Sequence, residues 1–345
     1  MCKTRALLRV ALFAALAFML AGPDIACAEP LDSPLEMMFA PDNMLVAGPL
    51  IEINPTGRIV IQRKEVISGK DHPPEKIDVR STTDVPGGLK VGDHYVVAYS
   101  MYRRDPRNPV AMAMNPDGAT ALVSPGIEPA VFRDTPEFRA ILKAGRTEPG
   151  RESRALLDLL IAALSSPDPQ LQNLAGGEIA FEPELGEELR DSDRAALEKA
   201  ARDTHASLHM RTMLLEGAAR QPKTLGDWWR AVALQIVTTT PVDGYSDKAP
   251  DPVSLILTAF EVLDRYSVKV PPETLQRWVW NPNPPLVERV CVMLRRESPE
   301  QERSTIQRAL ADPKLPGTTR KFLNDHLRRL DRINERARTR KEGTG

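Results

Sequence analysis

Two histidines carry the clearest metal-ligand spacing in the chain. His205 and His209 lie four residues apart, so on a helix they would share one face, as paired metal ligands do. Asp203 or Glu216 could add an oxygen ligand. In the zinc hydrolase motif a glutamate follows the first histidine, whereas here Ala206 stands at that position. The pattern therefore favours ordinary surface histidines, with a metal site as the alternative.

The densest run of carboxylates lies a short distance before these histidines. Paired carboxylates can act as acid and base, and acidic clusters can bind calcium, but the spacing here does not match a calcium-binding loop. We interpret the run as a solvated loop between helices, with a patch that binds a partner as the functional alternative. Its members are Glu178, Glu182, Glu184, Glu187, Glu188, Asp191 and Asp193.

Nucleophilic catalysis finds no support in the sequence. The chain contains neither a Gly-x-Ser-x-Gly elbow nor a Ser-x-x-Lys motif with partners. Cys291 lies in the apolar run 290–294 and is predicted to be a small buried hydrophobe. No glycine-rich loop opens a helix to hold a phosphate. We therefore expect no catalytic residue and no cofactor.

The four tryptophans form two close pairs, Trp228 with Trp229 and Trp278 with Trp280. The members of a pair cannot both face the same way on one helix, so at least one of each pair could lie on an exposed groove. Tryptophan is a good anchor for a binding partner. The other interpretation is that the pairs seal the core beside the loops at 240–252 and 281–285.

The C-terminal segment, residues 320–341, holds nine basic residues against three acidic ones. It keeps an apolar stripe, which predicts a last helix that caps the helical part and has a solvated outer face. Weak contact with an anionic membrane surface is the second interpretation. The stripe consists of Leu323, Leu327, Leu330 and Ile333.

Short strands separated by turns are predicted in the first part of the chain. The expected strands are residues 44–47, 50–53, 58–67, 76–80, 94–101, 110–114 and 119–123, with a hairpin turn at 54–57. In the strand at 94–101, Tyr95, Val97 and Tyr99 share one face and Val96 and Ala98 the other. Such a set of strands fits a small antiparallel barrel or sandwich.

This half resembles the OB-like barrels of the netrin/TIMP-like class. The resemblance rests on the segments at 58–61, 65–69, 75–79 and 89–97. The cysteines that TIMP-type inhibitors use at their amino terminus are absent, so no inhibitory residue is carried over. The resemblance implies an OB-like barrel domain over residues 29–134.

From residue 135 onward the apolar residues repeat with the period of helices. Helices are expected over 151–164, from about 169, over 194–201, from 208, around 231–237, and over 253–266, 272–280, 286–296, 299–311 and 318–338. The segments at 156–160 and 166–175 resemble a HEAT-type repeat, in which a proline-aspartate turn links two helices. Gly176 and Gly177 would let such helices pack closely. The resemblance implies an α-solenoid over residues 135–345.

The first residues predict where the protein works. A basic start, an apolar run over 10–21 and the segment Ala26-Cys27-Ala28 predict a signal peptide over residues 1–28, cleaved after Ala28. Its removal changes the formal net charge from −1 to about −3, which gives no field to attract nucleic acid. Cys291 is then the single cysteine, and no later segment is apolar enough to span a membrane.

The sequence thus predicts an α+β chain, an OB-like barrel followed by a helical-repeat domain. We expect a periplasmic or secreted protein without catalysis, whose helical surface binds a protein partner in the cell envelope. A metal-dependent hydrolase with a site in the interdomain cleft, near His205 and His209, is the alternative. A barrel-type protease inhibitor is the third interpretation.

Overall fold

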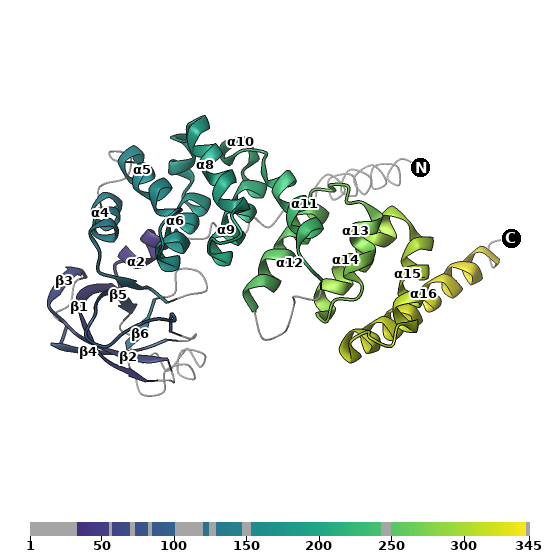
Figure 1. Ribbon diagram of the computed structural model, residues 1–345, viewed down its shortest axis with the longest axis horizontal. Helices are drawn as coiled ribbons and strands as arrows, with labels where there is room; N and C mark the ends of the chain where they lie inside the picture. The colour runs from purple at the N-terminus through teal and green to yellow at the C-terminus, as the bar shows by residue number, and fades with distance from the viewer. Residues whose placement is uncertain are drawn as a thin grey trace, which may run out of the picture. The chain divides into compact units, whose positions relative to one another are not determined.

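The computed structural model describes residues 33–54, 57–69, 73–81, 85–100, 120–123, 129–146, 153–242 and 250–342 (Figure 1). The predicted signal peptide, its cleavage position after Ala28 and the strand expected over 110–114 lie outside these ranges. Within them the chain is α+β, because a mostly antiparallel sheet precedes a domain of many helices. No helix of the described part is long and apolar enough to cross a membrane.

In the part of the chain that the structure describes, seven strands form one sheet. Their order of hydrogen-bonded neighbours is β3-β1-β2-β4-β6-β5-β7, and β1 also pairs with β5. The strands are β1 (Asn43–Asn54), β2 (Arg58–Gln62), β3 (Glu65–Ser68), β4 (Lys76–Arg80), β5 (His94–Ser100), β6 (Thr120–Leu122) and β7 (Val131–Arg133).

The first strand shows how local sequence shapes the sheet. The two strands expected at 44–47 and 50–53 are one continuous β1, whose register with β2 shifts between Leu50 and Glu52. Gly48 permits the close approach there: a Cβ at this position would lie 1.9 Å from the carbonyl oxygen of Gln62. The predicted hairpin from β1 into β2 is confirmed by the antiparallel pair Asn54 and Arg58.

The alternation predicted for β5 divides the core of this region in two. Tyr95, Val97 and Tyr99 are buried in a cluster formed by strand residues. Val96 and Ala98 point the other way, into the cluster that continues through the helices. One face of β5 thus belongs to the sheet's own core, and the other face joins the sheet to the helical domain.

One strand pair departs from the antiparallel pattern. β4 and β6 run parallel, through Val79 with Thr120 and Arg80 with Ala121. β6 joins β5 through two residue pairs as well, whereas β1 and β5 share seven. The pairing through β6 is therefore the shortest part of the sheet. The sheet is mostly antiparallel and is not closed into the barrel that the sequence predicts.

The helices begin close to where the sequence predicts them. Four helices were not expected from the periodicity: α2 (Pro34–Phe39), α4 (Pro136–Gly145), and the short helices α7 (Pro183–Glu187) and α10 (Pro222–Leu225). The others are α5 (Ser153–Ala163), α6 (Pro169–Phe181), α8 (Asp191–Arg202), α9 (Leu208–Arg220), α11 (Trp229–Thr239), α12 (Pro250–Arg265), α13 (Pro272–Trp278), α14 (Pro284–Glu297), α15 (Pro299–Ala311) and α16 (Gly317–Glu342).

Consecutive helices pack in pairs, and alternate helices pack from pair to pair. The pairs are α5 with α6, α8 with α9, α11 with α12, α13 with α14, and α15 with α16. Between pairs, α6 contacts α9, α9 contacts α12, α12 contacts α14, and α14 contacts α16. One buried cluster of apolar side chains runs through all of these helices.

Small residues set the distance between α6 and α9, as the sequence predicts. A Cβ at Gly176 would lie 2.6 Å from Cγ of Met210, and one at Gly177 would lie 3.1 Å from Sδ of Met213. On the facing helix, Gly217 lies against Ala180. These glycines let two helix backbones approach where larger residues would separate them.

Candidate functional site

A cavity of about 680 Å³ lies where the sheet meets the first helices of the helical domain. This volume is in the range of binding pockets for small molecules or for a few side chains of a partner. Its lining comes from the loop before β5, the end of β7, α4, α5 and the turn into α6. The residues are Gly87, Arg133, Thr135, Glu137, Ile141, Leu159, Ala162, Ala163, Ser166, Pro167, Asp168, Pro169 and Leu171.

The wall formed by α4 is fixed to the sheet at several points. Thr135 caps the helix, since its Oγ1 accepts a hydrogen bond from the N–H of Phe138 at 3.2 Å. Arg139 forms ion pairs with Asp134 at 2.6 Å and with Glu65 of β3 at 2.9 Å. The Arg139 guanidinium holds the pKa of the Asp134 carboxyl below its usual range.

An aromatic contact adds to this attachment. The rings of Phe132 on β7 and Phe138 on α4 stack with their centroids 4.5 Å apart. Both side chains are buried. The end of β7 and the start of α4, which supply Arg133, Thr135 and Glu137 to the pocket, are therefore held together by core packing.

The opposite side of the pocket is a turn whose polar groups are satisfied within the protein. Asp168 caps α6 by accepting a hydrogen bond from the N–H of Gln170 at 2.9 Å. Gln172 donates to the carbonyl of Ser166 at 2.7 Å and accepts from the N–H of Ser207 at 2.7 Å. This turn is thus tied to the start of α9, and the pocket has a fixed shape.

The lining divides into an apolar part and a polar rim. Ile141, Ala163 and Leu171 are buried, and Leu159 is half-buried. Arg133 and Glu137 are exposed and carry opposite charges. A pocket with an apolar interior and a charged rim has room for an apolar group and polar partners for the groups next to it.

The two members of each tryptophan pair differ in burial. Trp229 and Trp278 are buried at 1% and 0% exposure, so they belong to the core. Trp228 and Trp280 are half-buried, and their Nε1 atoms donate to the carbonyl of Leu225 at 2.8 Å and to Asp312 at 3.0 Å. One member of each pair therefore retains some exposed surface, and none of the four lines the pocket.

The two histidines do not lie on one helix. His205 is exposed in the turn before α9, and His209 is half-buried in the first turn of that helix. Asp203 accepts a hydrogen bond from the backbone N–H of His205 and so shapes this turn. In the part of the chain that the structure describes, neither histidine belongs to a group of three metal-ligating side chains.

The acidic run is not a single solvated loop, as the sequence interpretation had it. Glu178 is buried on α6, where it accepts hydrogen bonds from the N–H of Leu35 at 2.8 Å and the hydroxyl of Ser33 at 3.0 Å. Burial raises the pKa of Glu178 to about 7, although these two hydrogen bonds favour its ionised form. Asp193 is buried as well, paired with Arg154 at 2.6 Å.

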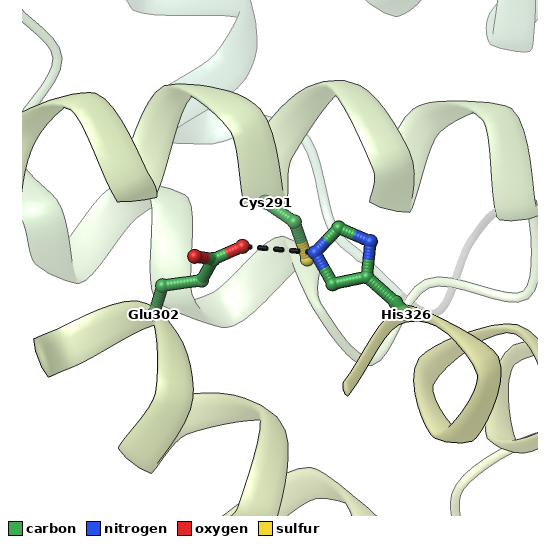
Figure 2. Close-up of side chains that lie close together, drawn as sticks. All are labelled: Cys291, Glu302 and His326. Atoms are coloured by element: carbon green, nitrogen blue, oxygen red, sulfur yellow. Dashed lines mark hydrogen bonds and ion pairs between the residues drawn. The ribbon is translucent and has the colours of Figure 1, made fainter. Parts of the chain in front are cut away.

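A buried cluster of chemically active side chains lies near the C-terminus, on three different helices (Figure 2). Cys291 of α14, Glu302 of α15 and His326 of α16 place their ligand atoms within 4.8 Å of one another. Their exposures are 0%, 1% and 5%. Sulfur, oxygen and nitrogen donors of this kind suit a metal ion such as Zn²⁺.

Arg295 completes this cluster from the same helix as Cys291. Its Nε and Nη2 donate to the two carboxylate oxygens of Glu302, each at 2.8 Å. Nε2 of His326 lies 2.9 Å from Oε1 of Glu302 and 3.0 Å from Nη2 of Arg295. Burial opposes ionisation of Glu302, yet the bonds from Arg295 and His326 outweigh it and hold its pKa below the ordinary value.

Sequence reasoning did not find this cluster. It treated Cys291 as a buried hydrophobe, which agrees with its burial, and burial raises the pKa of its thiol to about 12. The available signal was polar residues on apolar faces: His326 falls between Leu323 and Leu327 on the stripe of the last helix. The packing of α14, α15 and α16, which brings these side chains together, could not be predicted from a single sequence.

Comparison with family models, with curated proteins and with solved structures finds no match to this chain.

Proposed function

We propose that the protein is a periplasmic or secreted binding protein without catalysis, and that its helical domain holds a protein partner of the cell envelope. The observation that carries this proposal is the pocket between the sheet and the helical domain. Its walls are held by capping, ion pairs and core packing, so it is preorganised and loses little conformational entropy when a ligand binds.

The chemistry of the pocket suggests how the partner binds. An apolar side chain of the partner enters between Ile141, Leu159 and Leu171, where it is removed from water. The adjacent backbone or polar side chains of the partner meet Arg133 and Glu137 on the rim. Because the rim carries both charges, we infer a partner segment of mixed polarity around one apolar anchor.

We propose in addition that the sheet is a partly open relative of the OB-like barrels. The support is the cycle of strand pairings, which leads from β1 through β2, β4, β6 and β5 back to β1. A parallel pair, β4 with β6, lies within this cycle. β6 has only two residue pairs with each of its neighbours, so the sheet is open at this strand, as in the partly open barrels of the OB class.

The helical domain, on this proposal, is a degenerate HEAT-like repeat array. Its support is the regular succession of paired helices, in which α6, α9, α12, α14 and α16 each contact the next. Repeat arrays present extended surfaces for partner proteins, and the function belongs to those surfaces rather than to a reaction centre.

A single substitution in the pocket tests this proposal. Ala162 lines the pocket and is exposed, so Ala162→Arg fills the pocket without disturbing the core. Ala195→Arg makes the same change at an exposed position of α8 that does not line the pocket. Each variant of residues 29–345 is used to capture partners from an extract of the protein's own envelope.

The expected result is one protein recovered in near-equal molar amount with the wild type and with Ala195→Arg. Ala162→Arg should recover little of it, while its thermal unfolding is unchanged. Equal recovery with Ala162→Arg would refute the pocket as the binding site, and no recovered partner would refute the binding function.

A further inference from the structure

We propose that Cys291, Glu302 and His326 form a binding site for a Zn²⁺-like transition-metal ion, and that Arg295 holds the place of this ion when it is absent (Figure 2). This site is separate from the pocket and does not depend on the proposed binding function.

The donor set is the first argument. Thiolate, imidazole and carboxylate are the three ligand types that Zn²⁺ takes from proteins, with bond lengths of about 2.0 to 2.3 Å. Tetrahedral coordination at these lengths separates the donor atoms by about 3.3 to 3.7 Å. In the structure Nε2 of His326 and Oε1 of Glu302 are 2.9 Å apart, and all three donor atoms lie within 4.8 Å. Shifts on the order of an ångström would bring them around one ion.

Burial is the second argument. Acidic groups that gather on a surface are solvated and need no ion, whereas these three side chains are removed from water. They come from three successive helices, α14, α15 and α16, and converge on one point (Figure 2). A metal ion there would tie the last helix to the two before it.

Arg295 supplies the third argument, because a positive group already occupies this point. Its guanidinium pairs with both oxygens of Glu302 and also lies 3.0 Å from Nε2 of His326. Nε2 of His326 thus faces both an N–H donor of Arg295 and an acceptor oxygen of Glu302. A ring nitrogen carries either a proton or a lone pair, so it can satisfy only one of these two partners. A metal cation at this point would accept the lone pair of the imidazole and balance the negative charge of the carboxylate, so both side chains would have a partner.

Arg295 is also the one member of the cluster that can leave. Its side chain is 36% exposed, whereas that of Glu302 is 2% exposed, so the guanidinium can turn outward into water. On binding, the Cys291 thiol loses its proton to the solvent and forms the metal–sulfur bond. The ion, the thiolate and the carboxylate then sum to zero charge, and water takes the fourth position that Arg295 has vacated.

Cobalt provides a direct test, because Co²⁺ replaces Zn²⁺ and a cobalt–thiolate bond has its own charge-transfer absorption. Cys291 is the single cysteine of residues 29–345, so this absorption reports on one side chain. We expect one equivalent of Co²⁺ to produce the band and Zn²⁺ to displace it. Cys291→Ala should abolish the band, and His326→Gln and Glu302→Gln should weaken Zn²⁺ binding by more than the roughly 10- to 100-fold that loss of an outer-shell partner costs.

Arg295→Gln separates a metal site from a merely structural ion pair. If Arg295 competes with the ion, this variant should bind Zn²⁺ at least about tenfold more tightly, because a unit charge next to the ligands has been removed. His205→Gln changes an exposed histidine outside the cluster and should bind Zn²⁺ as the wild type does. Circular dichroism of the metal-free chains identifies any variant that fails to fold, and Cys291→Ala, a small apolar change, keeps the test informative.

Absence of the thiolate band in the folded wild type would overturn the proposal. Zn²⁺ binding that is unchanged in Cys291→Ala, or that weakens in Arg295→Gln, would overturn it as well.

Discussion

The carboxylate of Glu178 accepts a hydrogen bond from the backbone N–H of Leu35 at 2.8 Å, although 143 residues separate the two in sequence. Leu35 lies in the first turn of α2, and the side chain of Ser33 donates to the same carboxylate. Leu35 and Met38 are buried against the helical domain. A buried acid thus holds the segment that precedes the sheet onto α6.

The same acid makes stability depend on pH. Burial raises the pKa of Glu178 from 4.5 to about 7, so the folded chain binds this proton more tightly than the unfolded chain does. The resulting stabilisation is fully present below pH 4.5 and is lost as the pH rises through about 7. Glutamine can accept from Leu35 and donate to Ser33 without carrying charge. Glu178→Gln should therefore be more stable than the wild type at pH 8, by at most roughly 3 kcal/mol.

Urea unfolding of both chains at pH 5, 6, 7 and 8 measures this difference. It should shrink steadily toward pH 5, and the exposed Glu184→Gln should show no such trend. A difference that is constant across this range would contradict the account of Glu178.

The contact between α6 and α9 predicts a penalty for one added methyl group. A Cβ at Gly217 would lie 2.7 Å from Cβ of Ala180 and 3.0 Å from its Cα, and neither backbone can move away freely. Gly217→Ala should lower the free energy of unfolding by about 1 to 3 kcal/mol, because overpacking outweighs the better helix propensity of alanine. Gly317→Ala at the start of α16 meets open space and serves as the control, which should be neutral. Equal stabilities in urea would refute the close helix contact.

The burial of Trp278 predicts a large effect from a conservative change. Its ring packs edge-on against Phe260 with centroids 5.7 Å apart, and its Nε1 donates to the carbonyl of Val237 at 2.8 Å. Trp278→Phe removes this hydrogen bond and buried volume, while Arg277 still donates to the same carbonyl. We expect a loss of about 2 kcal/mol in unfolding free energy. Trp280→Phe, at a half-buried position, should lose less. Similar losses for the two variants would contradict this assignment.

Local sequence predicted much of the fold because its signals are periodic. The alternation in β5 assigned Tyr95 and Val96 to opposite faces, and the proline-aspartate turn placed the start of α6 at its cap Asp168. Helix ends were predicted less well. The helix expected over 194–201 begins at Asp191, and its N-cap is Arg190, whose backbone N–H donates to the side chain of Asp193.

The candidate site residues were harder to predict from the sequence than the helices and strands. His205 and His209 share a spacing, but the turn that Asp203 stabilises keeps them off a common helix. Glu302 and His326 come into contact because separate helices pack together, and their spacing in the sequence does not predict this contact. The pocket likewise joins residues from the sheet and from helices α4, α5 and α6, which only the folded chain brings together.

The most direct test of the proposed function is photo-crosslinking from inside the pocket. A photoreactive phenylalanine derivative replaces Leu159, a half-buried residue of the pocket wall, and the protein is irradiated in its own cell envelope. The same residue at Ala195, outside the pocket, is the control. The account predicts an adduct with one envelope protein from position 159 and none from position 195. No adduct from position 159, or the same adducts from both positions, would contradict it.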